Sequence, residues 1–171
     1  MPRAAPADAV PRQFDPEAVL RKPLMATLAT VSADGAPRAA PVWFLWEDGA
    51  LWMPGDAGTS SVRRLGRDAR AAVEIVDFDL AAGRLLHLGL RGRAEVLPMA
   101  PDRFRRLLAR YLGPDEAAWN PWFIREIARI DSPEGRLIRL APDSVFTNNV
   151  SHFLTGPALA WPPDDPAQDG I

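Results

Sequence analysis

Apolar and polar positions alternate along most of residues 25–97, and turn residues separate the alternating runs. Alternation places side chains on the two faces of a strand in turn, so each run predicts a half-buried β-strand. The predicted strands cover residues 25–32, 38–46, 50–53, 70–78 and 85–97. Asp34-Gly35 and Asp48-Gly49 separate the first three runs, and Asp-Gly is a pair that type I′ hairpin turns favour. The pattern predicts an antiparallel meander.

A helical period replaces alternation after residue 100. Apolar residues recur at helical spacing over 101–112, and Gly113 follows directly, as it often does at a helix end. A second helix is predicted over 115–129, and a last strand over 136–140 that continues through Val145 and Phe146. Two shorter helices are predicted earlier, one after Asp15 and a hydroxyl-capped one over 59–66.

Strands in hairpin order followed by helices do not fit an alternating βαβ fold. A small, mainly β barrel of five or six antiparallel strands with appended helices fits better, because closure removes exposed sheet edges. The domain is predicted over residues 15–156. We expect a flexible N-terminal arm over 1–14 and an irregular, proline-rich tail over 157–171.

Composition narrows the function classes. The 171 residues suit one domain, and a net charge of −2 gives no electrostatic case for nucleic acid or an anionic membrane as partner. The absence of cysteine excludes thiolate chemistry, and two histidines are too few for a histidine-rich metal site, so no metal site is predicted. No stretch of 18 apolar residues occurs, and a cytoplasmic location is expected.

The loop before the predicted helix 59–66 is a candidate phosphate site. The N-terminus of a helix offers unpaired backbone N–H groups and a partial positive charge, which favour an anion. Hydroxyl donors and arginines lie nearby in the sequence: Thr59, Ser60, Ser61, Arg38, Arg63 and Arg64. The alternative is that the hydroxyls only cap the helix.

Four aromatic residues crowd one hairpin: Trp43, Phe44, Trp46 and Trp52. Alternation sends Trp43 to one face and Phe44 and Trp46 to the other, so the rings cannot share one core face. Either a second buried surface exists, such as a dimer interface, or a ring-shaped ligand contacts them. Trp119, Trp122 and Phe123 on the second predicted helix suggest a core face, with a pocket wall as the alternative.

The ionisable residues of the predicted strands leave several interpretations open. His87 lies among leucines, so it is either a structural histidine or a ligand contact. Glu74, Asp77 and Asp79 are typical of a solvated strand face and turn rather than of a catalytic carboxylate pair. The sequence lacks the Gly-x-Ser-x-Gly elbow of hydrolases and the glycine fingerprints of nucleotide-binding folds.

Several segments together resemble a known family. They are Met25 to Arg38, Pro41-Val42-Trp43-Phe44, Asp48 to Trp52, Ser61 to Leu65, Arg91 to Val96 and Arg136 to Pro142. Their order and spacing are similar to those of the pyridoxamine 5′-phosphate oxidase-like family of flavin and deazaflavin split barrels. The resemblance extends over residues 17–147.

The resemblance implies a six-stranded antiparallel split β-barrel that forms a homodimer, with FMN at the subunit interface. It implies an oxidoreductase that acts on an unidentified small molecule. The positions that match the family's cofactor contacts are Arg38, Ala39, Ala40, Pro41, Val42, Trp43, Met53, Pro54, Thr59, Ser60, Ser61, Arg64 and His87. Among these, Arg38 and Thr59 to Ser61 match phosphate contacts, and His87 matches a residue that faces the flavin from the partner strand.

Two departures from the family pattern stand out. Ser61 replaces the usual phosphate lysine, and the only lysine, Lys22, is far earlier in the chain. The chain also ends in Trp161-Pro162-Pro163-Asp164-Asp165 instead of the Trp and Arg-rich motif of the true oxidase, which argues against pyridoxamine phosphate as the substrate. The alternatives are an F420-dependent reductase and a non-catalytic flavin- or haem-binding protein.

Overall fold

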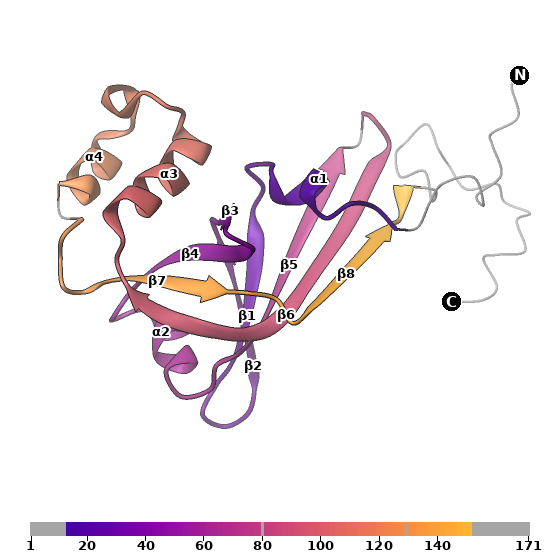
Figure 1. Ribbon diagram of the computed structural model, residues 1–171, viewed down its shortest axis with the longest axis horizontal. Helices are drawn as coiled ribbons and strands as arrows, with labels where there is room; N and C mark the ends of the chain where they lie inside the picture. Colours follow the sequence, from indigo (N-terminus) through magenta and orange to yellow (C-terminus); the bar gives the residue numbers. More distant parts are fainter. Residues whose placement is uncertain (1–12, 80, 129, 152–171) are drawn as a thin grey trace, which may run out of the picture.

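The computed structural model describes residues 13–79, 81–128 and 130–151. Its centre is an eight-stranded antiparallel sheet (Figure 1). Its strands are β1 (Ala26–Val31), β2 (Pro37–Val42), β3 (Leu45–Glu47), β4 (Ala50–Asp56), β5 (Arg70–Asp79), β6 (Arg84–Pro98), β7 (Gly135–Leu140) and β8 (Ser144–Asn149). Most of the predicted arm 1–14 and the whole tail 157–171 lie outside the described residues, so these two predictions stay untested.

The strand order is β2-β1-β5-β6-β7-β4-β3, and β8 pairs with β6 as well. The end strands β2 and β3 do not pair with each other within the described residues, which leaves the barrel split on that side. The prediction of a mainly β split barrel is confirmed. The count of six strands was too low, because two predicted runs are each divided in two.

Each division has a cause that the structure shows. Between β2 and β3, strand pairing is interrupted at Trp43 and Phe44, and the Phe44 N–H donates to the hydroxyl of Tyr111 instead of to a strand. Between β7 and β8 lies Pro142, which has no N–H for a ladder. The chain passes so close to β6 there that a Cβ on Gly92 would lie 2.9 Å from the carbonyl oxygen of Ala141. Glycine at this position permits that approach.

β6 belongs to both halves of the sheet. Its first part pairs with β8 over Leu86–Arg91, and its second part pairs with β7 over Ala94–Pro98. Along its other edge it pairs with β5 over Arg84–Arg93. The alternate residues of β5 and β6 that point inward, among them Ile75, Leu88 and Leu90, have no exposed surface and form the main core.

In the described part of the chain, four α-helices flank the sheet: α1 (Glu17–Leu20), α2 (Ser60–Leu65), α3 (Pro101–Leu112) and α4 (Pro121–Ile127). Figure 1 shows α2 beside the β1–β2 end of the molecule and the α3–α4 pair beyond β4 and β7. The single helix predicted over 115–129 is wrong. A 3₁₀ turn over Glu116–Ala118 is followed by an extended Trp119, and α4 begins only at Pro121, which suits the first turn of a helix.

The two Asp-Gly turns differ. Asp48 (φ 55°) and Gly49 (φ 68°) both adopt positive φ, as a type I′ turn requires. At the first turn only Gly35 does (φ 81°), and Ser32 pairs with Ala36 across a three-residue loop, so the type I′ prediction is wrong there. The Asp34 carboxylate accepts hydrogen bonds from the Ser32 hydroxyl and the Ala36 N–H and thereby stabilises the longer loop.

Tyr111 connects α3 to the barrel. Its hydroxyl accepts from the Phe44 N–H at 3.0 Å and donates to the carbonyl oxygen of Leu24 at 2.9 Å. We expect Tyr111→Phe to lower the free energy of unfolding by about 1–2 kcal/mol, because the Phe44 N–H loses its partner in a part-buried place. Urea denaturation measures the change, and Thr147→Val is a matched hydroxyl deletion on an edge strand. Equal stability of the two variants would contradict this role.

Candidate functional site

Arg64 and Arg38 both contact Thr30 at one end of the barrel. The buried Val62 and Leu65 fix α2 against the core, and the Nε atom of Arg64 donates to the hydroxyl of Thr30 at 2.8 Å. Thr30 lies opposite Arg38 in the β1–β2 register, and its hydroxyl is 3.4 Å from the Arg38 carbonyl oxygen. Within the described part of the chain, neither arginine forms an ion pair. Two guanidinium groups are therefore free to neutralise an anion.

The hydroxyl residues at the start of α2 lie at the same end. Thr59 does not cap the helix with its side chain; its hydroxyl accepts from the Asp56 N–H at 3.2 Å instead. The predicted hydroxyl cap is therefore wrong. The hydroxyls of Ser60 and Ser61 have no hydrogen-bond partner among the described residues, and both residues are at least partly exposed. They are available as donors to a ligand.

His87 lies on the outer face of the sheet, beside a shallow hollow of about 320 Å³ that we call the outer hollow. Ala29, Ala39, Ala72 and Gly89 line it, with Arg91 and Phe146. The Nε2 atom of His87 lies 2.7 Å from the Glu74 Oε1 atom, and the imidazole packs edge-on against Phe146. The His87 side chain is 36% exposed, so it is not a core histidine. Glu74 is partnered rather than simply solvated.

The predicted contacts on β2 divide between two faces. Arg38, Ala40 and Val42 share the side of β2 that continues the core face of Leu28 and Thr30. Ala39 lines the outer hollow with His87, and Pro41 shares its side of the strand. A single chain therefore does not bring Arg38 and Arg64 together with His87. It presents two half-sites, one at α2 and one on the outer face.

Three predicted contact residues lie in neither half-site. The ring of Trp43 stacks on Tyr111 and Phe123, with centroids 4.6 and 5.5 Å apart. The Met53 side chain has no exposed surface. Pro54 lines a different hollow, beside Phe104 and Glu126. The structure does not bring their side chains to either half-site.

The aromatic hairpin packs within the chain. Phe44 and Trp46 contact the main core, while Trp43 packs on the cluster of α3 and α4, so the second buried surface expected from alternation exists. The indole N–H of Trp46 donates to Glu17 at 2.7 Å, and that of Trp52 donates to the Glu47 carbonyl oxygen at 3.1 Å. These polar edges are satisfied without a ligand.

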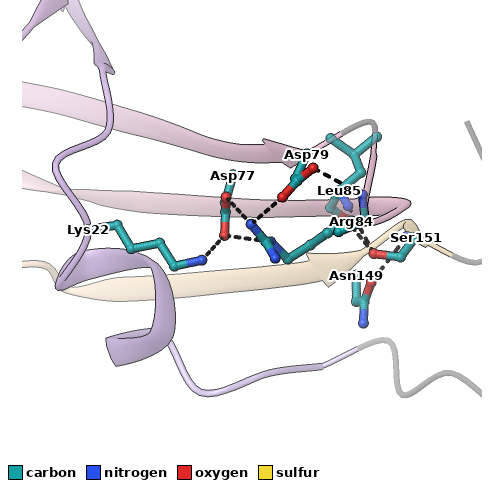
Figure 2. A network of polar contacts seen from close by, with 8 residues as sticks. Lys22, Asp77, Asp79, Arg84, Leu85, Asn149 and Ser151 are labelled. Atoms are coloured by element: carbon teal, nitrogen blue, oxygen red, sulfur yellow. Dashed lines mark hydrogen bonds and ion pairs between the residues drawn. The ribbon is translucent and has the colours of Figure 1, made fainter. Parts of the chain in front are cut away.

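Asp77 corrects another expectation, because it is buried and 3% exposed rather than solvated. Figure 2 shows its carboxylate between Lys22 and Arg84. Burial acts to raise the pKa of Asp77, but hydrogen bonds from Lys22 and Arg84 outweigh it, and the pKa lies below its ordinary value. Lys22 is therefore engaged near the β5–β6 hairpin and does not replace the missing lysine at α2.

Sequence reasoning missed Thr30, Glu74 and Phe146 as members of the half-sites. Thr30 could have been found, since the hairpin register places it opposite Arg38. Glu74 and Phe146 reach His87 through the β5–β6 and β6–β8 pairings. Those registers depend on long-range contacts, which a single sequence does not specify.

Comparison with known proteins adds independent findings. The model of the family described as pyridoxamine 5′-phosphate oxidase matches residues 16–149. No curated protein matches the chain. Among the described residues, no helix is long and apolar enough to cross a membrane, and no group of three or more His, Cys, Asp or Glu side chains is placed to hold a metal ion.

Three solved structures illustrate the likeness. A conserved hypothetical protein from Mycobacterium tuberculosis is 21% identical, with 90% of this chain and 92% of that one covered and a TM-score of 0.66. An F420 reductase is 26% identical, with 80% and 98% covered and a TM-score of 0.60. A haem storage protein from Vibrio cholerae is 16% identical, with 80% and 95% covered and a TM-score of 0.60. Because the first and the third are less than 25% identical to this chain, their likeness shows a common fold and nothing more.

Proposed function

Because this chain belongs to the pyridoxamine 5′-phosphate oxidase family, we propose that it is an FMN-binding oxidoreductase that acts on a small molecule. The observation that carries the proposal is the convergence of Arg38 and Arg64 at Thr30, beside the free hydroxyls of α2. Guanidinium groups and hydroxyls are the donors that a phosphate prefers. The bound flavin would supply the hydride chemistry, and these residues would anchor its phosphate.

We propose that two copies of the chain enclose the flavin. The two half-sites lie on different faces of one chain, so a second copy is needed to place His87 of one beside Arg38 and Arg64 of the other. Large apolar side chains on β5 and β8 support a covered surface, since Val76, Phe78, Val145 and Phe146 are each at least 42% exposed. Sedimentation equilibrium tests this: a monomer at micromolar concentration contradicts it.

F420 is the second candidate cofactor. The F420 reductase has the higher identity among the neighbours described above, and Ser61 stands where the family has a lysine. A phosphodiester such as that of F420 carries one negative charge, whereas the FMN phosphate approaches two, so the phosphate group of F420 needs less neutralisation at α2.

Titration of the purified protein with FMN, riboflavin and F420 tests the cofactor. We expect FMN to bind at least about 10-fold more tightly than riboflavin, which has no phosphate, because one charge-assisted hydrogen bond contributes about 1.5–3 kcal/mol. Binding of F420 without FMN would favour the second candidate, and binding of neither would overturn both. If neither NADPH nor reduced F420 reduces the bound cofactor, a non-catalytic cofactor-binding protein is favoured. Titration with haemin then tests whether the protein binds haem.

Ser61 stands where the family has a phosphate-binding lysine, so restoring that lysine should raise the affinity for FMN. Ser61→Lys is expected to tighten FMN about 5-fold, because an added ammonium group near a phosphate contributes about 1 kcal/mol at a partly exposed site. Fluorescence titration measures the affinity, and Ala118→Lys, at an exposed position in the 3₁₀ turn before α4, adds the same charge away from both half-sites. Unchanged affinity of the Ser61 variant would show that the phosphate does not lie at this helix.

A further inference from the structure

The outer hollow combines a flat floor with two polar ends. Three alanines and a glycine from β1, β2, β5 and β6 form the floor, so no long side chain obstructs a planar molecule. His87 lies at one end with Glu74, and Arg91 lies at the other, four residues further along β6. Phe146 from β8 contacts the imidazole edge-on and limits its rotation. The charged groups that face the hollow are Glu74 and Arg91; β1, β2 and β8 contribute uncharged residues.

The contact between His87 and Glu74 assigns the ring nitrogens. A carboxylate only accepts hydrogen bonds, so the contact of 2.7 Å places a proton on Nε2. Nδ1 then remains for other partners, and it has none among the described residues. The two side chains are 36% and 55% exposed, so this pair contributes little to stability. A carboxylate that orients an imidazole in this way is the arrangement in which histidine transfers protons.

We propose that Glu74 and His87 form an acid–base dyad whose Nδ1 atom supplies the proton when a flat conjugated acceptor is reduced in the outer hollow. The inference rests on the proposed function. Such a reduction takes a hydride to one atom and a proton to another, so that one π bond breaks and two bonds to hydrogen form. The hydride comes from the reduced cofactor, which loses two electrons. Protonated His87 gives up its Nδ1 proton, stays bonded to Glu74 through Nε2, and regains a proton from water. Glu74 is a positioning residue.

Nitrogen-15 NMR of histidine-labelled protein tests the dyad without cofactor. The chain has two histidines, and His87→Gln assigns the signals. We expect a downfield Nε2–H signal of His87 that Glu74→Ala removes. Glu95→Ala is the control, because Glu95 is an exposed glutamate elsewhere on β6 that pairs with Arg139 of β7. We expect this variant to keep the His87 signal. A His87 proton found on Nδ1 alone would overturn the proposal.

Oxidation of the pre-reduced FMN protein tests the proton transfer. Menadione needs a proton with its electrons, whereas ferricyanide takes electrons alone. Glu74→Ala is expected to slow menadione reduction about 10-fold and His87→Gln about 100-fold, since general acids contribute about 10²–10⁴-fold, while ferricyanide reduction is unchanged in both. Equal effects on both oxidants would show a structural role and overturn the dyad. Loss of FMN binding in the wild-type protein would instead overturn the proposed function, and the NMR result would still judge the dyad.

Discussion

Asp77→Asn is expected to lower the free energy of unfolding by about 2 kcal/mol at pH 7. The carboxylate is almost fully buried, and the cations that it holds come from two parts of the chain: Lys22 precedes β1, and Arg84 begins β6. Loss of one partner of a buried ion pair costs about 3–5 kcal/mol, but Lys22 and Arg84 are more than a third exposed, so water replaces part of the interaction. Urea denaturation measures the difference.

The effect depends on pH in a defined direction. The pKa of Asp77 in the folded protein is lower than its ordinary value of 3.8, so the unfolded chain binds the proton more readily. The stabilisation is therefore complete above about pH 5 and is lost as the pH falls below 4 through the folded pKa. Wild type and variant should converge in stability there.

Asp79→Asn is the matched control for this prediction. Asp79 also pairs with Arg84, at 3.3 Å, but its side chain is 39% exposed. We expect a change of about 0.5 kcal/mol or less, as for other exposed pairs. If Asp77→Asn cost no more than this control, the buried carboxylate would not hold Lys22 and β6 together.

Local patterns predicted what depends on neighbours in the sequence. Alternation located the five runs that contain β1 to β6, and a glycine after residue 112 marked the end of α3. Alternation also predicted that Trp43 lies on the opposite face from Phe44 and Trp46. The structure confirms this, because Trp43 packs with α3 and α4 while the other two contact the main core. The division of the 38–46 run could not be predicted, because it depends on the Tyr111 hydroxyl, 67 residues away from Phe44.

Charged residues were harder to place for the same reason. Asp77 looked solvated because its neighbours on β5 alternate regularly, yet its position is decided by Lys22, 55 residues earlier. In the candidate site, the sequence indicated Arg38, Arg64 and His87 separately. Their assignment to two different faces required the strand registers of the barrel. Hence the sequence predicted these three residues as ligand contacts, and the structure showed that they belong to two half-sites on different faces.

Arg64→Met is expected to weaken FMN binding about 30-fold. The substitution keeps an apolar stem on α2 and removes the guanidinium that Thr30 orients through Nε. Because Nε is engaged by Thr30, the terminal nitrogens are directed and little side-chain entropy is lost when they bind a phosphate. One or two charge-assisted hydrogen bonds of about 1.5–3 kcal/mol each account for this loss. Riboflavin affinity should change little, since riboflavin has no phosphate.

Arg63→Met distinguishes a positioned guanidinium from general positive charge. Arg63 is the preceding residue of α2, but it is exposed and has no side-chain partner among the described residues. A Kd within about 5-fold of wild type is expected, since an exposed charge contributes at most about 1 kcal/mol. Thermal unfolding of both variants controls for damage to α2. Equal weakening by the two substitutions would mean that the phosphate responds to the net charge of α2, and the convergence of Arg38 and Arg64 at Thr30 would then not define the site.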